Sequence, residues 1–254
     1  MIKILLVGCN GKMGTMISTV AQNSTTLTIA AGFDSKTEGN FNYPVYDSLT
    51  NVKENVDVVL DFSRPATLDS ICEFVLNRKI PVVFCTTGYS AEQLNKIQGL
   101  SAEVPVFHSA NMSIGINIVN NILKTISNTL YKDFDIEIIE KHHNQKVDAP
   151  SGTALLLANT IKDSIEAETE FNYGREGIAK REHKEIGIHA IRGGNIIGDH
   201  EVIFAGKGEV IEIKHSAISR EVFAVGALKA CEYVYDKTPG MYSMDNVVND
   251  TIKF

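Results

Sequence analysis

The chain has 254 residues, a net charge of −7 at neutral pH and an apolar fraction of 44%. This length allows one large domain or two modest ones, and the ordinary composition excludes a disordered chain. The acidic balance argues against a nucleic-acid-binding surface, which needs a basic face, but it leaves room for a local basic pocket that binds an anion.

The cysteines and the amino-terminal segment indicate the cellular setting. The four cysteines are scattered, without a C-x-x-C pair or a histidine at metal-ligand spacing, which is typical of reduced cytosolic thiols. The apolar run at residues 2–7 is too short to cross a membrane and lacks the cleavage region of a signal peptide. We therefore expect a cytoplasmic protein with no bound metal, no nucleic-acid partner and no membrane partner.

The first half of the chain alternates short apolar runs with stretches of helical length. The runs are rich in β-branched residues, which is typical of strands buried on both faces of a parallel sheet. The expected strands are 2–7, 27–31, 56–62, 80–86 and 104–108, and the expected helices are 13–22, 67–77 and 91–99. This order predicts an α/β fold with a Rossmann-like, doubly wound parallel sheet.

The second half has a different pattern, because its apolar residues partly alternate with polar ones and its helices become sparse. The expected strands are 134–140, 186–191, 201–204 and 210–216, and one amphipathic helix is expected at about 152–166. The polar stretch 166–184 is expected to be a mobile loop. We predict a smaller α+β domain here, after which an apolar helix at 223–235 returns the chain to the first domain.

A glycine-rich segment directly follows the first expected strand and opens the first expected helix. Its spacing is G-x-x-G-x-x-G, because Asn10 occupies the middle position of the commoner G-x-G-x-x-G motif. Glycines there let the backbone turn tightly and bring a pyrophosphate to the helix N-terminus. The predicted dinucleotide-binding residues of this segment are Gly8, Asn10, Gly11, Lys12, Met13 and Gly14.

Asp34 ends the second expected strand, about 20 residues after the glycines, where an acid binds the adenosine ribose hydroxyls. Its charge would repel the 2′-phosphate of NADPH, although Lys12 and Lys36 are close enough in sequence to soften that effect. We expect NADH as the preferred cofactor and NADPH as the second candidate. An ordinary glycine turn beside a surface aspartate is the alternative interpretation.

Two further loops are expected at the carboxyl ends of parallel strands, where doubly wound sheets bind ligands. Phe62 follows the third strand, and Thr86, Thr87 and Gly88 follow the fourth. We expect these residues to border the nicotinamide. Without the glycine motif upstream, the Thr-Thr-Gly sequence would be equally consistent with a simple turn.

The segment 140–154, EKHHNQKVDAPSGTA, is the most informative part of the chain. Ser151 is expected to cap a helix whose first amides, at Gly152 and Thr153, form a carboxylate site together with the neighbouring hydroxyls. A protonated Lys146 or a nearby histidine could supply the proton that hydride addition requires. His142 and His143 need not face the same way, since successive strand residues point to opposite faces. A polar loop before a capped helix is the alternative interpretation.

These motifs resemble the 4-hydroxy-tetrahydrodipicolinate reductase (dihydrodipicolinate reductase) family over essentially the whole chain. The matching segments are 8–14, 85–88, 110–113, 140–154, 192–200, 219–220 and 223–228. The resemblance implies reduction of 4-hydroxy-tetrahydrodipicolinate, through its dehydrated form, to tetrahydrodipicolinate. NAD(P)H would supply the hydride, and the reaction would belong to lysine and diaminopimelate biosynthesis.

The resemblance also implies residue roles and an assembly. His142 and Lys146 correspond to the family's acid/base candidates. Substrate-binding positions fall on His143, Gly152 and Thr153, and Ser151 joins them at the cap; further cofactor contacts fall on Ala110, Asn111 and Met112. Residues 1–112 and 222–254 would form a discontinuous dinucleotide-binding domain. Residues 113–221 would form the substrate-binding domain that joins a homotetramer.

Two departures from the family pattern affect these expectations. Asn144 and Gln145 stand where some members carry basic residues, which predicts weaker substrate binding. Ser35 follows Asp34 in place of the arginine of dual-cofactor members, which favours NADH. The alternatives are another two-domain dehydrogenase, which would share only the glycine loop, or a nucleotide-sensing protein that binds NADH without turnover.

Overall fold

The computed structural model describes residues 1–251 and divides into two compact units. Among the described residues, the first unit contains Met1–Ser113 together with 220–251, and the second contains Ile114–Ser219. Residues 252–254, the end of the expected domain segment 222–254, lie outside the described residues. The division into functional domains at 1–112 with 222–254, and 113–221, remains our proposal.

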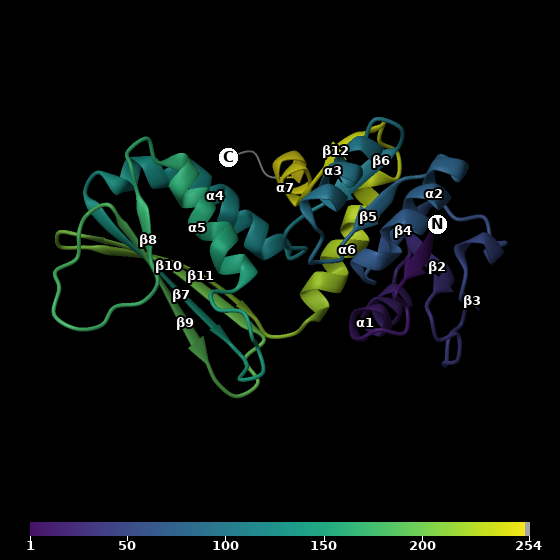
Figure 1. Cartoon of the computed structure of the whole chain (residues 1–254), viewed down its shortest axis with the longest axis horizontal. Coiled ribbons are helices and arrows are strands. Elements are labelled where there is room, and N and C mark those ends of the chain that lie inside the picture. The colour runs from purple at the N-terminus through teal and green to yellow at the C-terminus, as the bar shows by residue number, and fades with distance from the viewer. Residues whose placement is uncertain (252–254) are drawn as a thin grey trace. The chain divides into compact units, whose positions relative to one another are not determined.

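The first unit is built on a seven-stranded sheet in the described chain, with the order β12-β6-β5-β4-β1-β2-β3 (Figure 1). Each pair of neighbouring strands runs parallel. The strands are β1 Ile2–Val7, β2 Leu27–Phe33, β3 Val45–Tyr46, β4 Val58–Asp61, β5 Val82–Phe84, β6 Pro105–His108 and β12 Gly240–Tyr242. The strand order reverses at β1, between β2 and β4, so a ligand site is expected at the carboxyl ends of these strands. The predicted doubly wound sheet is confirmed.

Helices pack around this sheet. They are α1 Lys12–Ala21, α2 Leu68–Arg78, α3 Ala91–Leu100, α6 Glu221–Val234 and α7 Met244–Thr251, with short 3-10 helices η1 Leu49–Asn51 and η2 Pro65–Thr67. Residues of α2 and α3 share a buried apolar cluster with Leu5 and Val7, which alternate along β1. Helix α6 contacts α1 and strands β4, β5 and β6, so the late apolar helix belongs to the first unit, as expected.

The second unit is a five-stranded mixed sheet in the order β11-β10-β7-β9-β8, with two helices on one face. The strands are β7 Phe134–His142, β8 Glu170–Asn172, β9 Glu185–Arg192, β10 Gly198–Gly206 and β11 Val210–Ala217, and the helices are α4 Ile114–Tyr131 and α5 Gly152–Ser164. Alternate residues of β7, such as Ile136 and Ile138, pack with Leu157 and Ile161 of α5 in one buried cluster. The predicted α+β unit is confirmed.

Several elements differ from the sequence-based expectations. Helix α4 was not predicted, although it is 18 residues long. The stretch 166–184, expected to be a loop, contains β8, whose residues pair with Glu185–Gly187 of β9. Strand β3, strand β12 and helix α7 were also missed; each is short, so neighbouring elements determine it more than its own sequence does.

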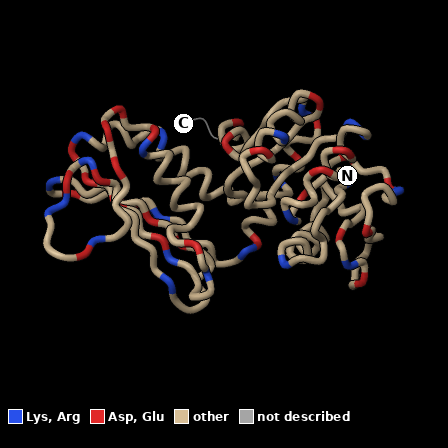
Figure 2. The backbone as a smooth tube through the Cα atoms, viewed as in Figure 1, with Lys and Arg blue, Asp and Glu red and all other residues tan. Residues whose placement is uncertain are grey.

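Residues of both charges are interspersed along the backbone of both units (Figure 2). None of the described helices is long and apolar enough to span a membrane.

Candidate active site

The glycine loop after β1 has a backbone that side chains would obstruct. Gly8 has φ +82°, and a Cβ atom built there would lie 2.6 Å from the Phe62 carbonyl oxygen. A Cβ atom on Gly14 would overlap the carbonyl oxygen of Gly8 and lie 2.6 Å from the Cys9 Cα atom. The two glycines therefore allow a close approach between this loop, the start of α1 and the end of β4.

The N-terminus of α1 is suited to bind an anion. Its N-cap is Gly11, and among the described residues no side chain caps the helix and no acid lies in its first turn. The first amides of a helix have no partner within the helix and carry partial positive charge. Together with the cradle of glycines, they fit the pyrophosphate of a dinucleotide.

Asp34 lies beside this loop, held by backbone amides. Its Oδ2 atom accepts a hydrogen bond from the Asn10 amide at 3.0 Å, and its Oδ1 atom accepts one from the Lys36 amide at 3.3 Å. The Asn10 side chain donates to the carbonyl oxygens of Lys36 and Glu38, at 3.0 and 2.9 Å. The predicted ribose-binding acid and the glycine loop are thus one connected structure.

The buried carboxylate of Asp61 links the loop after β4 to the loop after β5. Asp61, at the end of β4, is fully buried and accepts hydrogen bonds from the Ser63 amide and the Tyr89 hydroxyl, both at 3.0 Å. Burial raises the pKa of Asp61, and hydrogen bonds from Ser63, Thr86 and Tyr89 offset part of that effect. The sequence singled out the neighbours of Asp61 but gave it and Tyr89 no role.

The predicted cofactor-binding residues of the first unit lie at the carboxyl ends of neighbouring strands. Gly8–Gly14 follow β1, Asp34 follows β2, Phe62 follows β4, Thr86–Gly88 follow β5 and Ala110–Met112 follow β6. Thr86 and Met112 are buried, whereas Lys12, Thr87, Gly88 and Ala110 are exposed. The structure therefore brings these segments to one edge of one sheet.

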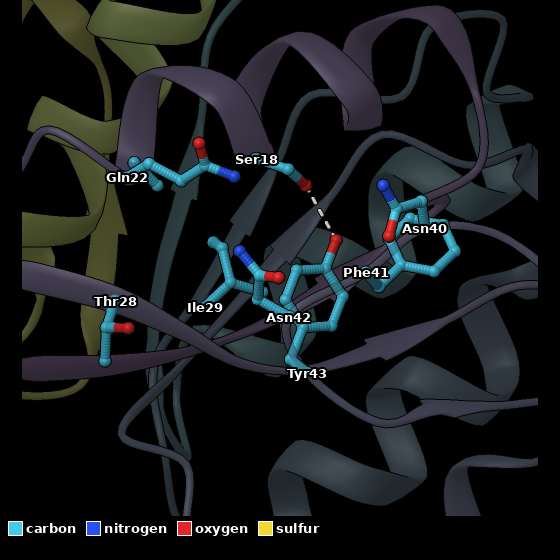
Figure 3. Close-up of a pocket in the computed structure, with 9 residues that line it drawn as sticks. Ser18, Gln22, Thr28, Ile29, Asn40, Phe41, Asn42 and Tyr43 are labelled. Atoms are coloured by element: carbon cyan, nitrogen blue, oxygen red, sulfur yellow. Dashed lines mark hydrogen bonds between the residues drawn. The ribbon is translucent and has the colours of Figure 1, made fainter.

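A separate pocket of about 200 Å³ lies between α1 and the chain around β2 (Figure 3). Thr28 and Ile29, in the first half of β2, line it, and Ser18 and Tyr43 face each other across 2.6 Å between their hydroxyl oxygens. Its lining includes none of the residues predicted to hold the dinucleotide, so it is distinct from that edge of the sheet.

In the second unit, Glu140 is the centre of a buried polar cluster. Its carboxylate is fully buried and receives two hydrogen bonds from Arg192, at 2.7 and 2.8 Å, and one from the Ser151 amide at 2.9 Å. Burial alone would raise the pKa of Glu140, but the hydrogen bonds from Arg192, His142 and Ser151 outweigh it and hold the pKa below its usual value. Glu140 is therefore an ionised carboxylate inside the protein.

His142 lies two residues further along β7, on the same face as Glu140. Its Nδ1 atom lies 2.6 Å from Oε2 of Glu140, and the residue is almost buried, with 8% exposed. A Cβ atom on Gly198 would come within 3.1 Å of the His142 Nε2 atom, so glycine there leaves room for the ring. The His200 ring is 5.2 Å away between centroids, and burial lowers the pKa of His200 to about 4.

Lys146 lies in the loop after β7 and forms an ion pair with Asp148, with 2.7 Å between Nζ and Oδ1. The hydrogen bond from Lys146 lowers the pKa of Asp148. Arg192 also donates to the Asp148 carbonyl oxygen at 2.7 Å, which connects this loop to the Glu140 cluster. His143 is half-buried, and its carbonyl oxygen accepts the Lys146 amide at 3.1 Å.

Ser151 caps α5, as predicted, by accepting a hydrogen bond from the Ala154 amide at 3.1 Å. Its hydroxyl oxygen also lies 3.0 Å from Nε2 of His200, and the residue is 2% exposed. The Ser151 hydroxyl is thus engaged inside the protein, while Gly152 is exposed and Thr153 half-buried at the start of the helix.

Sequence reasoning assigned no role to Arg192 or His200. Strand register places both of them, because Arg192 pairs with His142 across β9 and β7, and His200 pairs with Glu140 across β10 and β7. Both residues fall within the family-like segment 192–200, which was the available signal.

A doubly wound sheet with a dinucleotide-type glycine loop, and a second unit with a buried His–Glu–Arg cluster beside a lysine, define a two-domain NAD(P)H-dependent oxidoreductase. The chain belongs to the dihydrodipicolinate reductase family. The model of the family's N-terminal part matches residues 2–112, and the model of its C-terminal part matches residues 115–248.

Individual relatives agree with this membership. A 4-hydroxy-tetrahydrodipicolinate reductase from Clostridium novyi (strain NT) is 64% identical, and the match covers 98% of each chain. A protein of the same name from Caldanaerobacter subterraneus subsp. tengcongensis is 47% identical over 98% of each chain. The solved structure of a dipicolinate-bound dihydrodipicolinate reductase from Paenisporosarcina sp. TG-14 has the same fold, with a TM-score of 0.82, 24% identity and coverage of 97% of this chain and 99% of that one.

Proposed function

We propose that the protein reduces the dehydrated form of 4-hydroxy-tetrahydrodipicolinate to tetrahydrodipicolinate, with hydride from NAD(P)H, in lysine and diaminopimelate biosynthesis. The observation that carries the proposal is the 64% identity, over 98% of both chains, to a reductase of that name. The buried cluster around Glu140 supports it, because it holds an imidazole beside a helix N-terminus and a lysine.

We assign the acid/base role to His142 and Lys146. Bound NAD(P)H supplies the hydride, and a group of the protein must supply the proton that completes the reduction. Lys146 has a partly exposed ammonium group, and His142 has one ring nitrogen that is not engaged with Glu140. His143, Ser151, Gly152 and Thr153 form the proposed carboxylate site, since the amides at the start of α5 attract anions.

NADH is our proposed preferred cofactor. Asp34 lies beside the glycine loop with both carboxylate oxygens facing backbone amides, and its charge opposes a 2′-phosphate. The side chains of Lys12 and Lys36 are exposed, so water screens any attraction they exert on that phosphate. NADPH remains the second candidate.

We also propose a homotetramer assembled through the second unit, working in the cytoplasm. Helices α4 and α5 cover one face of the five-stranded sheet, and the other face carries Ile139, Ile191 and Ile203 among charged residues. A strand-rich face with isoleucines among charges of both signs is suited to pair with a second copy. The four cysteines are free thiols, which fits a reducing compartment.

The proposed reaction is tested by following the oxidation of NADH through its loss of absorbance. Substrate is made in situ from pyruvate and aspartate semialdehyde by a purified dihydrodipicolinate synthase, with an NADPH arm in parallel. Oxidation that requires both precursors is the expected result, faster with NADH. NADH binding without such oxidation would contradict the proposal and favour another dehydrogenase or a nucleotide sensor.

A further inference from the structure

We propose that Glu140 and Arg192 are positioning residues that hold the His142 ring in one tautomer, so that its proton is exchanged at Nε2. The proposal rests on the acid/base role of His142 proposed above. It concerns how the protein orients and protonates that imidazole, and it assigns functions to a carboxylate and a guanidinium that sequence reasoning left without any.

The contacts of Glu140 determine its charge state. Each carboxylate oxygen accepts one hydrogen bond from Arg192; Oε1 also accepts the Ser151 amide, and Oε2 also faces Nδ1 of His142 at 2.6 Å. Arg192 and the Ser151 amide can only donate, and a charged guanidinium bound to both oxygens favours the ionised carboxylate over the protonated one. Inside a protein, an ionised carboxylate with a bidentate arginine is the arrangement that satisfies all of them.

An ionised Glu140 fixes the tautomer of His142. Because the carboxylate can only accept, the hydrogen atom between the two groups must be on Nδ1 of the imidazole, whether the ring is neutral or charged. The second ring nitrogen, Nε2, is then the site where a proton is gained or lost. A Cβ atom at position 198 would crowd that nitrogen at 3.1 Å, and the glycine there avoids the contact.

The other groups around the ring are either paired in charge or neutral. From β9, Arg192 balances the charge of Glu140, and from the loop after β7, Asp148 is paired with Lys146. From β10, His200 packs edge-on against His142 with 5.2 Å between ring centroids. The pKa of His200 is lowered to about 4 by burial, so His200 stays neutral and does not compete for the proton near neutral pH.

Strand β7 contains a similar carboxylate that serves as a matched control. Glu137 accepts hydrogen bonds from Arg175 and Arg181, and its Oε2 atom lies 2.7 Å from Nε2 of His189. Its position in the strand alternates with that of Glu140, so it lies on the opposite face of the sheet, away from His142. Replacing Glu137 removes an arginine–carboxylate–histidine group from the same strand without touching the proposed acid/base residue.

The test is a double-mutant cycle on the full-length enzyme. Glu140→Gln places an amide among four donors, and His142→Asn keeps a donor near the Nδ1 position while removing Nε2. We expect E140Q to lower kcat by about 100-fold or more, within the range that positioned acid/base groups contribute, with a smaller change in KM. Because Glu140 acts through His142, adding E140Q to H142N should cause no further loss of kcat.

Two readouts separate positioning from a purely structural role. In E140Q, Arg192 is left without its carboxylate partner, and its charge disfavours a further positive charge nearby, so the acidic limb of the pH profile of kcat should move to lower pH. Glu140→Asp, which keeps the charge, should recover at least about tenfold of the lost kcat. NADH binding and thermal unfolding show whether E140Q folds. If it does not, the kcat of E140D is compared with that of E137Q instead.

The outcomes distinguish this proposal from the proposed function. Wild-type turnover in H142N would show that His142 has no acid/base role. Loss of turnover in H142N, combined with additive losses in the double variant or an unmoved pH profile in E140Q, would overturn the positioning role of Glu140 alone. An equal loss of kcat in E137Q and E140Q, or in E137Q and E140D where E140Q does not fold, would show a general effect of disrupting β7 and would overturn the proposal. A folded E140Q that is as active as E140D would overturn it as well, because the charge of the carboxylate would then have no effect.

Discussion

Asp34 and Asn10 form the proposed adenosine end of the dinucleotide site. The Asn10 side chain ties the chain at Lys36 and Glu38 to the glycine loop, and its amide donates to Asp34. The carboxylate therefore has little freedom to turn away from an incoming 2′-phosphate. Its charge, more than its hydrogen bonding, should decide between NADH and NADPH.

Asp34→Asn tests this directly, because it keeps an acceptor for the Asn10 amide and removes the charge. We expect the ratio of kcat/KM for NADPH to that for NADH to rise by about tenfold or more, equivalent to roughly 1.4 kcal/mol. Steady-state kinetics with each cofactor measure it. Asp57→Asn is the control, since Asp57 also accepts a backbone amide, that of Lys3, but lies near the start of β1. An unchanged ratio in the Asp34 variant would mean that another group sets the preference.

His200 makes stability depend on pH. Its pKa in the folded protein is about 4, below the ordinary value of 6.5, because burial disfavours the charged ring. Between these values the unfolded state binds more protons than the folded state, so stability falls as the pH drops from about 6.5 towards 4.

The corresponding variant is His200→Gln, which retains a group able to bond the Ser151 hydroxyl. Between pH 7 and pH 5, the wild type should lose on the order of 2 kcal/mol more unfolding free energy than the variant. Urea unfolding at several pH values measures this difference. The pKa values of His108 and His215 are also lowered, but both residues are present in both proteins and cancel in the comparison. Parallel pH curves for the two proteins would contradict the prediction.

At the scale of elements, Gly226 lets helix α6 pack closely against the backbone of Met112. A Cβ atom on Gly226 would overlap the carbonyl oxygen of Met112, which is backbone and has little room to move. Helix propensity favours alanine over glycine by up to about 1 kcal/mol, so packing and propensity oppose each other at this position.

We expect packing to dominate, so that Gly226→Ala lowers the unfolding free energy by about 2 kcal/mol or more. Gly99, in helix α3, is the matched control, because a Cβ atom there would meet nothing within 4 Å. Gly99→Ala should raise stability by up to about 1 kcal/mol. Thermal and urea unfolding of the two variants measure these differences. Unfolding free energies that change in the same direction in both variants would refute the packing argument.

The sequence predicted the longer elements of the first unit, β1, β2, β4, β5, β6, α1, α2, α3 and α6, because their apolar runs are continuous and separated by clear turn residues, but it missed the short β3, β12 and α7. It missed α4, whose buried face includes Asn117, Asn120 and Asn121 beside Val119 and Leu123. Asparagine is a weak helix former, so local propensity concealed a helix that packing against α5 and β7 stabilises.

The candidate site was predictable in its local parts and not in its long-range ones. The glycine loop, the Asp34 position and the Ser151 cap follow from short motifs with fixed geometry. Arg192 and His200 reach Glu140 and His142 only through the pairing of β7 with β9 and β10. That register is set by the packing of the whole sheet, which spacing along the chain does not reveal.

At the scale of the whole molecule, the two units separate the proposed tasks. The segments predicted to hold the dinucleotide lie in the first unit, and the proposed acid/base residues His142 and Lys146 lie in the second. Variants in the first unit should therefore change cofactor KM, and variants around Glu140 should change kcat and its pH dependence. We also propose that the second unit carries the assembly, through its exposed sheet face.

Ile203 lies near the middle of that face, paired in register with Glu137 of β7 and Glu212 of β11. If the face joins subunits, Ile203→Lys would bury a charge without a matching partner and should convert the tetramer to smaller species. Light scattering after size exclusion, over a range of protein concentrations, measures the mass. Leu94→Lys is the control, because Leu94 is an exposed apolar residue, 41% accessible, on α3 of the first unit. A tetramer that persists in I203K would place the interface elsewhere, because a buried charge on this face would then have been tolerated. A wild-type protein with the mass of a monomer would exclude the proposed assembly.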